Sequence, residues 1–377
     1  MNEQIRPFRS PVGEADWHDL RERIERTRWA DESPAEGRER GIRTGELREL
    51  AEYWADEYDW RAADAAPART PQFETEIDGQ RIHFLHARSS RPDAQVLLLT
   101  HGYPSANVEF LRVIGLLTEP EAGPAFHIVA PSLPGYGFST PLAGAGWTMA
   151  RIARAWVELM RRLGYERYGL HAADIGAGVA NFVASFDAEH VTGLHVATDP
   201  ETAAHTATFI PGMVDALDRD DPVDRLILER MEEFQTDGSG YLAIQNTRPQ
   251  TIGYGLVDSP VFLLAWIVEK IQDWSAIEVD RDTMLGIVSA AWFGRSGASE
   301  AHVLYDQAHS HEWGGQVTVP QAVAVFGADA TVRKVMRPAD DTRWTEYAEG
   351  GHFPAMELPE VLAADLQEFF GALRSFP

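Results

Sequence analysis

Asp174 stands where the chain is expected to turn from a buried strand into a helix. The strand is the apolar run Tyr168–Ala172, and the turn reads Ala173-Asp174-Ile175-Gly176. Small neighbours suit a sharp turn, and a carboxylate held there is ionised at neutral pH and needs no base before it attacks an electrophilic carbon. The pattern predicts a nucleophile that forms an ester. A helix N-cap is the alternative interpretation, since aspartate is a preferred capping residue.

A histidine near the C-terminus could complete a catalytic set. His352 lies in Gly350-Gly351-His352-Phe353, and histidine suits general-base chemistry near neutral pH. The chain order nucleophile, acid, histidine is typical of the α/β-hydrolase fold. It predicts Asp329, three residues after the expected strand Gln321–Phe326, as the acid that holds the His352 tautomer and stabilises the imidazolium. Asp340 and Asp341 are rivals farther along the loop.

The turn after an earlier strand could stabilise negative charge on the reacting group. Gln95–Thr100 is a continuous apolar run that ends at His101-Gly102-Tyr103-Pro104. A turn there can aim the backbone N–H of Tyr103 at the nucleophile, and the N–H of Ile175 would be the second donor of an oxyanion hole. A plain strand-ending turn is the alternative. Tyr103-Pro104 is also a candidate cis peptide bond, because X–Pro bonds allow cis and tight turns favour it.

These side chains need a sheet that brings them together. Along residues 91–200 and 316–377, apolar runs without alternation, which indicate strands buried on both faces, alternate with helical segments. This predicts an α/β core of the α/β-hydrolase type, a mostly parallel sheet with helices on both faces. The expected strands are Gln95–Thr100, Phe126–Ala130, Tyr168–Ala172, His190–Thr198, Gln321–Phe326 and Arg343–Tyr347, and the expected helices are Trp147–Leu163, Ala177–Phe186 and Val361–Leu373.

Two segments depart from this alternation. Residues 1–90 read as amphipathic helices followed by a hairpin around an Asp-Gly turn, and we expect this N-terminal extension to wrap the core and the lid. Residues 201–315 show helical segments, many aromatic side chains and no clear strand, which is typical of an inserted helical lid. The extension's expected elements are helices Trp17–Arg28 and Thr44–Tyr58 and strands Phe73–Ile77 and Ile82–His86.

Composition excludes several classes of protein. The chain has 377 residues, no cysteine and a formal net charge of −25. Thiolate nucleophiles, disulfides and Cys-based zinc sites are therefore impossible, and the acidic balance disfavours nucleic acid or an anionic membrane as partner. The sequence contains no run long enough to span a membrane and no signal peptide, so we expect a cytoplasmic protein. Without metal-ligand spacing or a phosphate-binding glycine loop, we expect no metal and no other cofactor.

Taken together, the sequence resembles the epoxide hydrolases of the microsomal type, which are α/β-hydrolases with an N-terminal extension. The resemblance covers nearly the whole chain, and agreement over many spaced segments is more specific than one catalytic turn. Segments that carry it outside the catalytic turns are Trp17–Arg23, Thr27-Arg28-Trp29, Tyr53-Trp54, Pro71-Gln72-Phe73, Thr247–Thr251, Asp258-Ser259-Pro260 and Leu264–Ile267 with Glu269-Lys270.

The resemblance implies that the chain hydrolyses an epoxide to a vicinal diol without a cofactor. Asp174 matches the family's nucleophile, which forms a covalent ester, and His352 matches the base that activates a water. Asp329 matches the acid. Ile175 stands where the family often has tryptophan, and Ala173 where it usually has glycine. Both departures alter the shape of the pocket rather than remove a catalytic group.

Two lid tyrosines also follow from the resemblance, and the aromatic-rich lid favours an apolar substrate. Two lid tyrosines hold and protonate the epoxide oxygen in this family. Tyr241 matches one of them, and Tyr305 matches the other less closely, with Tyr254 as the fallback. Core packing is the alternative role of any lid tyrosine. An apolar or aromatic epoxide is expected to lie against Tyr103, Pro104, Ile175, Trp292 and Phe353.

Two other functions stay open at this point. A haloalkane dehalogenase would share the aspartate nucleophile but would need halide-binding N–H donors, commonly a tryptophan after the nucleophile, and Ile175 argues against it. A catalytically silent binder of small apolar ligands is the other alternative, and the presence of nucleophile, acid and base in order argues against it. A homodimer is the commonest state of soluble oligomers and is our expectation here.

Overall fold

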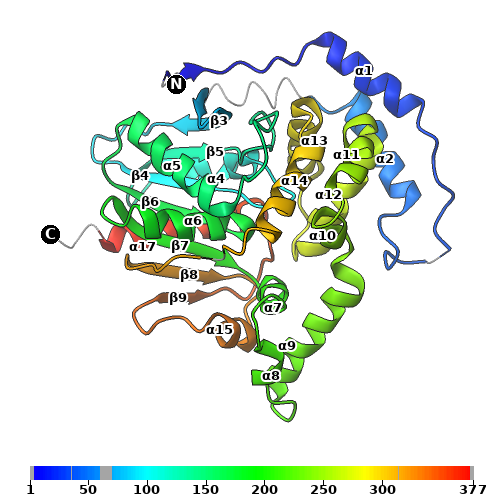
Figure 1. The fold of residues 1–377 in the computed structure, drawn as a ribbon. Helices are drawn as coiled ribbons and strands as arrows, with labels where there is room; N and C mark the ends of the chain where they lie inside the picture. The colour runs from blue at the N-terminus through cyan, green and yellow to red at the C-terminus, as the bar shows by residue number, and fades with distance from the viewer. Residues whose placement is uncertain (1–3, 35, 60–69, 313, 374–377) are drawn as a thin grey trace.

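The computed structural model describes residues 4–34, 36–59, 70–312 and 314–373. Within these residues, nine strands form one sheet (Figure 1). The core strands begin and end within one residue of the bounds expected from the apolar runs. The strands are β1 (Arg6–Pro7), β2 (Gln72–Ile77), β3 (Gln80–Ala87), β4 (Gln95–Thr100), β5 (Phe126–Pro131), β6 (Tyr168–Ala172), β7 (Val191–Thr198), β8 (Gln321–Val325) and β9 (Arg343–Glu346).

The order of the strands places the ends of β4, β6 and β7 next to one another. The sheet runs β1-β2-β3-β5-β4-β6-β7-β8-β9. Strands β1, β2, β3 and β5 pair antiparallel, and from β5 to β9 every neighbouring pair is parallel. This confirms the predicted mostly parallel sheet. Because parallel strands end at the same edge, the residues after β4, β6 and β7 meet there.

Helices cover both faces of the sheet, as the unbroken apolar strands require (Figure 1). In β4, Leu98 packs into the core under one pair of helices, while Leu97 and Leu99 pack into the core on the opposite face. The first pair is α5 (Met149–Leu163) and α6 (Asp174–Phe186), and the second is α4 (Leu111–Thr118) and α17 (Pro359–Leu373).

Helix α6 begins at Asp174 and not at Ala177, where the sequence pattern places its start. Asp174 has φ 53°, a left-handed conformation that a non-glycine residue adopts only under constraint. The constraint comes from close packing of α6 on β4. A Cβ on Gly176 would lie 2.4 Å from the carbonyl oxygen of Thr100 and 2.6 Å from that of His101.

Replacing Gly176 with alanine is expected to displace the start of α6 and lower stability by about 1–3 kcal/mol, because backbone faces the new methyl group. The melting temperature and the rate of diol formation should both fall. Gly115→Ala is the matched control, since Gly115 is exposed in the middle of α4 with nothing within 4 Å of a new Cβ. That variant should be neutral or more stable. Equal melting temperatures for the two variants would contradict the prediction.

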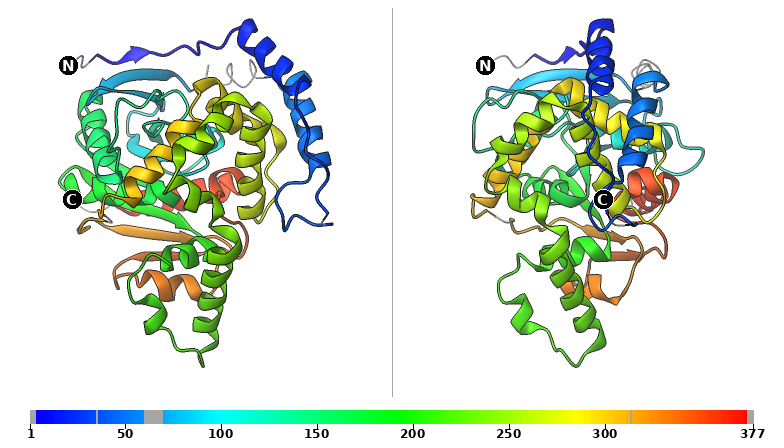
Figure 2. Two further views of the ribbon diagram at one scale, coloured as in Figure 1. Left: turned by 45° about the vertical axis from the view of Figure 1, so that its right-hand side comes forward. Right: turned by 90° about the vertical axis from the view of Figure 1, so that its right-hand side faces the viewer.

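Residues 200–308 form the expected helical insertion, and it has two parts. The first part, α7–α9, packs on α15 (Ala330–Met336) beside the sheet edge, and the second, α10–α14, lies beside the N-terminal helices (Figures 1 and 2). The helices of the insertion are α7 (Pro200–Ala207), α8 (Met213–Ala216), α9 (Pro222–Glu233), the π-helical turn η3 (Phe234–Gly238), α10 (Gly240–Gln245), α11 (Pro249–Asp258), α12 (Pro260–Trp274), α13 (Arg281–Gly294) and α14 (Gly297–Ala308).

The N-terminal helices share an apolar core with the insertion. Helices α1 (Glu14–Glu25) and α2 (Thr44–Asp56) pack on α12 and α13, and the buried Trp54 indole donates a hydrogen bond of 2.9 Å to Ser289 Oγ. Phe353, next to His352, belongs to the same core. The extension therefore supports the part of the lid that borders the histidine loop. Strands β2 and β3, expected within the extension, are part of the main sheet.

Among the described residues, no single helix is long and apolar enough to cross a membrane. Helices α11 and α12 pass that test only as a pair, and the chain bends by 113° between them.

Candidate active site

The carboxylate of Asp174 is held by backbone amides from two neighbouring strand ends. The Tyr103 N–H donates a hydrogen bond of 2.9 Å to Asp174 Oδ1, and the Ile175 N–H also stabilises the carboxylate. A Cβ on Gly102 would lie 2.6 Å from Oδ1, so only glycine allows this approach. Burial alone would raise the pKa of Asp174, but His352 and the two amides lower it below its usual value. Asp174 is therefore ionised at neutral pH.

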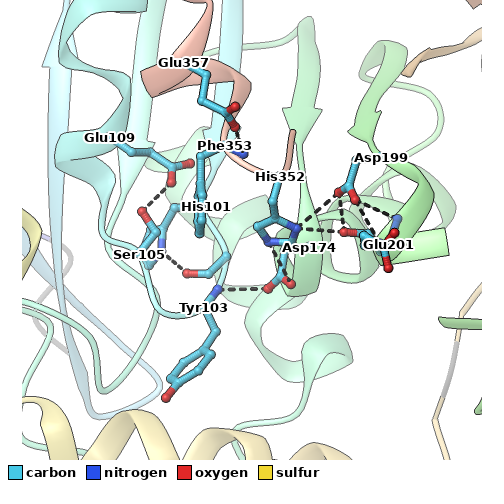
Figure 3. Close-up of polar contacts among 12 residues, drawn as sticks. His101, Tyr103, Ser105, Glu109, Asp174, Asp199, Glu201, His352, Phe353 and Glu357 are labelled. Carbon is cyan, nitrogen blue, oxygen red and sulfur yellow. Dashed lines mark hydrogen bonds and ion pairs between the residues drawn. The ribbon is translucent and has the colours of Figure 1, made fainter. Parts of the chain in front are cut away.

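The ring of His352 lies between two carboxylates (Figure 3). Its Nε2 is 3.4 Å from Asp174 Oδ2, and its Nδ1 is 3.3 Å from Asp199 Oδ2 and 2.7 Å from the Thr202 hydroxyl. Its backbone N–H bonds the carbonyl of Trp274 at 3.0 Å. Burial would lower the pKa of His352, but contact with Asp174 and Asp199 raises it to about 10. The resting site is an imidazolium between two carboxylates.

Asp199 is fixed by the helix that it caps. It follows β7 directly, and its Oδ1 accepts hydrogen bonds from the amides of Glu201 (2.9 Å) and Thr202 (3.0 Å) at the start of α7. The Thr202 hydroxyl donates to Oδ2 at 2.5 Å. Burial would raise the pKa of Asp199, but these bonds and His352 lower it. An ionised carboxylate with both oxygens held is suited to orient a histidine ring.

Asp329 is not the carboxylate that contacts His352, which corrects the contact expected from the sequence. It caps α15 at the end of β8, where Oδ1 accepts the Thr331 N–H at 2.8 Å. Its Oδ2 forms an ion pair of 2.7 Å with Arg230 of α9. The physical reason for the difference is that Arg230 holds Asp329, while Asp199 and Thr202 occupy Nδ1 of His352.

The sequence contains a signal that could have identified Asp199. Asp199 follows β7 as directly as Asp174 follows β6, and the two strands are parallel neighbours. The prediction of Asp329 depended on a position after a late strand and on the match to the family's acid. An aspartate directly after a central parallel strand is a candidate of equal standing.

Of the lid tyrosines, Tyr241 lies closest to the catalytic residues. Its ring is parallel to that of Tyr103 at 5.7 Å and tilted against that of Trp274 at 5.4 Å. Burial, and then the charge of Asp174, raise the pKa of Tyr241. Its hydroxyl therefore stays protonated and can donate a hydrogen bond.

The structure does not bring Tyr305 or Tyr254 to Asp174. Tyr305 stacks on His309 with ring centroids 4.1 Å apart, and Tyr254 is 68% exposed on α11. Among the described residues, no hydrogen bond or ring contact joins either tyrosine to Asp174, His352 or Tyr241. The partner of Tyr241 as donor to the epoxide oxygen stays a prediction.

The residues expected against the substrate divide into two places. Tyr103, Pro104 and Ile175 are buried around Asp174, and Tyr103-Pro104 is cis, as predicted. Phe353 contacts the His352 ring edge-on at 4.6 Å. Trp292 instead packs against Trp54 at 6.5 Å in the core shared with the N-terminal helices.

Trp274 is an aromatic wall residue that no sequence motif singles out. Its ring is 5.1 Å from that of His352 and 5.4 Å from that of Tyr241. The Trp274 ring therefore lies between the lid residue Tyr241 and the catalytic histidine. In the part of the chain that the structure describes, no three His, Asp or Glu side chains are grouped as metal ligands would be.

Comparisons with known proteins find similarity over nearly the whole chain. The family model "Epoxide hydrolase N terminus" matches residues 5–110, and the model "alpha/beta hydrolase fold" matches residues 95–276. Epoxide hydrolase 1 of Sus scrofa is 30% identical over 99% of this chain and 90% of its own length.

Two solved structures are similar over nearly their whole length. Aspergillus niger epoxide hydrolase is 30% identical, with a TM-score of 0.81 over 98% of this chain and 97% of that one. Juvenile hormone epoxide hydrolase from the silkworm Bombyx mori is 29% identical, with a TM-score of 0.81 over 99% of this chain and 95% of that one.

Proposed function

Because the chain belongs to the epoxide hydrolase family and hydrolyses an epoxide to a diol, we propose that it does so through a covalent ester on Asp174. The observation that carries this proposal is the His352 ring held between Asp174 and Asp199. A carboxylate nucleophile needs no base for its attack. A base positioned beside it is needed for the hydrolysis of its ester.

In the first step, Asp174 Oδ2 attacks a ring carbon and the carbon–oxygen bond of the epoxide breaks. Tyr241 gives its proton to the leaving oxygen and regains one from solvent. Burial raises the pKa of Tyr241, so its hydroxyl is protonated at neutral pH and has a proton to give to the leaving oxygen. The product is an ester that carries a neighbouring hydroxyl.

Ester formation also prepares His352 for the second step. The contacts with Asp174 and Asp199 together raise the pKa of His352, and esterification removes the charge of Asp174. The pKa therefore falls, and the imidazolium releases its proton to solvent. The same ring that stabilises the ionised nucleophile thus becomes a base only after the nucleophile has reacted.

In the second step, His352 takes a proton from a water, and the resulting hydroxide attacks Cγ of the ester. The amides of Tyr103 and Ile175 stabilise the oxyanion on Oδ1, where one such donor is typically worth ~10²–10³ in rate. When the intermediate collapses, the glycol oxygen leaves with a proton from the intermediate's hydroxyl. Ionised Asp174 and protonated His352 are restored. Asp199, with Thr202, holds the His352 tautomer in place of the expected Asp329.

We infer an apolar or aromatic epoxide as the substrate. Tyr103, Tyr241, Trp274 and Phe353 surround the catalytic residues with aromatic faces. Apolar walls with few polar groups are typical of sites for such ligands. A homodimer and a cytoplasmic location stay predictions from the sequence.

Wild type is expected to convert styrene oxide into its diol, and Asp174→Ala is expected to abolish the reaction, because the carboxylate that forms the ester is gone. Asp174→Asn should be inactive when fresh and regain activity slowly as the amide deamidates. Chromatography of the diol over time measures both. Diol formation by Asp174→Ala at the wild-type rate would overturn the covalent route.

A further inference from the structure

A small cavity lies against the catalytic residues Asp174 and His352. The centre of a water molecule can reach a volume of about 20 Å³ inside it. One water molecule needs about 10–15 Å³ by this measure, so the cavity has room for one. It is lined by Gly102, Glu109, Phe110, His171, Ala173, Asp174, His352, Phe353, Pro354 and Ala355. None of these residues belongs to the helical insertion at residues 200–308.

Glu109 is a buried acid that the proposed mechanism leaves without a role. It is 8% exposed, in the 3₁₀ helix η2 (Asn107–Phe110), and its Oε2 accepts a short hydrogen bond from Ser105 (Figure 3). Among the described residues, no hydrogen bond reaches its other oxygen, Oε1. Because Glu109 lines the cavity, Oε1 is available to a molecule inside it.

We propose that this cavity holds the water that hydrolyses the ester and that Glu109 positions it. The water would donate one hydrogen to His352 Nε2 and the other to Glu109 Oε1. These two bonds would turn a lone pair of the water oxygen toward Cγ of Asp174. The inference rests on the proposed ester mechanism and goes beyond it.

The position of the cavity explains how a water can survive substrate binding. The epoxide must lie between Asp174 and Tyr241, on the lid side, and no lid residue reaches the cavity. A water in the cavity therefore lies outside the space between Asp174 and the lid tyrosine, and the epoxide does not displace it. Burial raises the pKa of Glu109 to about 7, against the lowering effect of the Ser105 bond and the His352 charge. Near neutral pH a large share of the protein therefore carries the carboxylate that this role needs.

Glu109→Gln tests the proposal by separating ester formation from ester hydrolysis. After rapid mixing with styrene oxide, the ester should form at the wild-type rate and decay about 10- to 100-fold more slowly, because a misplaced water still reacts. Intact-protein mass against time measures both rates. In Glu109→Gln, the amide oxygen could still accept a hydrogen bond from the water if it faced the cavity. Glu109→Leu has no acceptor in any orientation, and its ester should decay at least as slowly.

Glu300→Gln is the matched control. Glu300 is also buried, with a pKa of about 7 and a hydrogen bond from the serine four residues before it, Ser296, but it does not line the cavity. Its ester should decay as fast as that of wild type. Wild-type decay in both Glu109 variants, equal slowing of formation and decay, or equal slowing in Glu300→Gln would overturn the role of Glu109. Absence of any ester, even in His352→Gln, would instead overturn the proposed function.

Discussion

The His352→Gln variant is expected to hold styrene oxide as a long-lived ester on Asp174, seen as a gain of one intact epoxide in the protein mass. Attack by Asp174 needs no base, whereas hydrolysis of the ester does. Loss of a positioned base costs on the order of 10²–10⁴ in rate, so the ester should accumulate within one turnover. The amides of Tyr103 and Ile175 still favour the ionised carboxylate in this variant.

The control is the double variant His352→Gln with Asp174→Ala, which should gain no mass. Peptide mapping of the single variant should place the adduct on the peptide that contains Asp174. An adduct that persists without Asp174 would assign the nucleophile to another residue. Absence of both adduct and diol across several epoxides would favour a silent binder, which halide-release and ligand-induced melting assays would separate from a dehalogenase.

The fold could be predicted from the sequence because its elements depend on local patterns. The unbroken apolar runs at β4 and β6 are buried on both faces, and the structure keeps their expected bounds without change. The predicted start of α6 was wrong because Asp174 adopts φ 53°, a left-handed conformation that depends on the close packing of α6 on β4 and not on a helix pattern. The extent of the extension was less predictable, since whether β2 and β3 join the main sheet depends on pairing with β5, far along the chain.

The site was predictable in its nucleophile and histidine, and less so in the groups that support them. Asp174 and Tyr103 meet because the turns after neighbouring strands must meet. The orientation of Tyr305 depends on which face of α14 packs inward, and the structure stacks it on His309. The cavity beside Glu109 depends on residues from three regions of the chain, residues 102–110, 171–174 and 352–355, which no local pattern can bring together.

Replacing the acid that orients His352 is expected to have the second large effect, and it separates Asp199 from Asp329. Asp199→Asn is expected to slow ester hydrolysis by about 10⁴-fold, as the loss of the orienting acid does in a serine triad, because asparagine cannot hold the same tautomer or stabilise the imidazolium. Asparagine still caps α7, so the fold should persist. The pKa of the resting His352, followed by NMR, should fall below that of wild type, since one of the two carboxylates that raise it is gone.

Asp329→Asn is the matched control, because Asp329 is likewise a helix N-cap and asparagine replaces it in the same way. It loses the ion pair with Arg230, a partly exposed contact worth at most about 1 kcal/mol. Melting temperature should fall slightly, while the ester lifetime and the pKa of His352 stay near those of wild type. The reverse result, an inactive Asp329→Asn beside an active Asp199→Asn, would show that the acid of the family pattern serves His352 in the reaction. Asp199 would then serve only as the N-cap of α7.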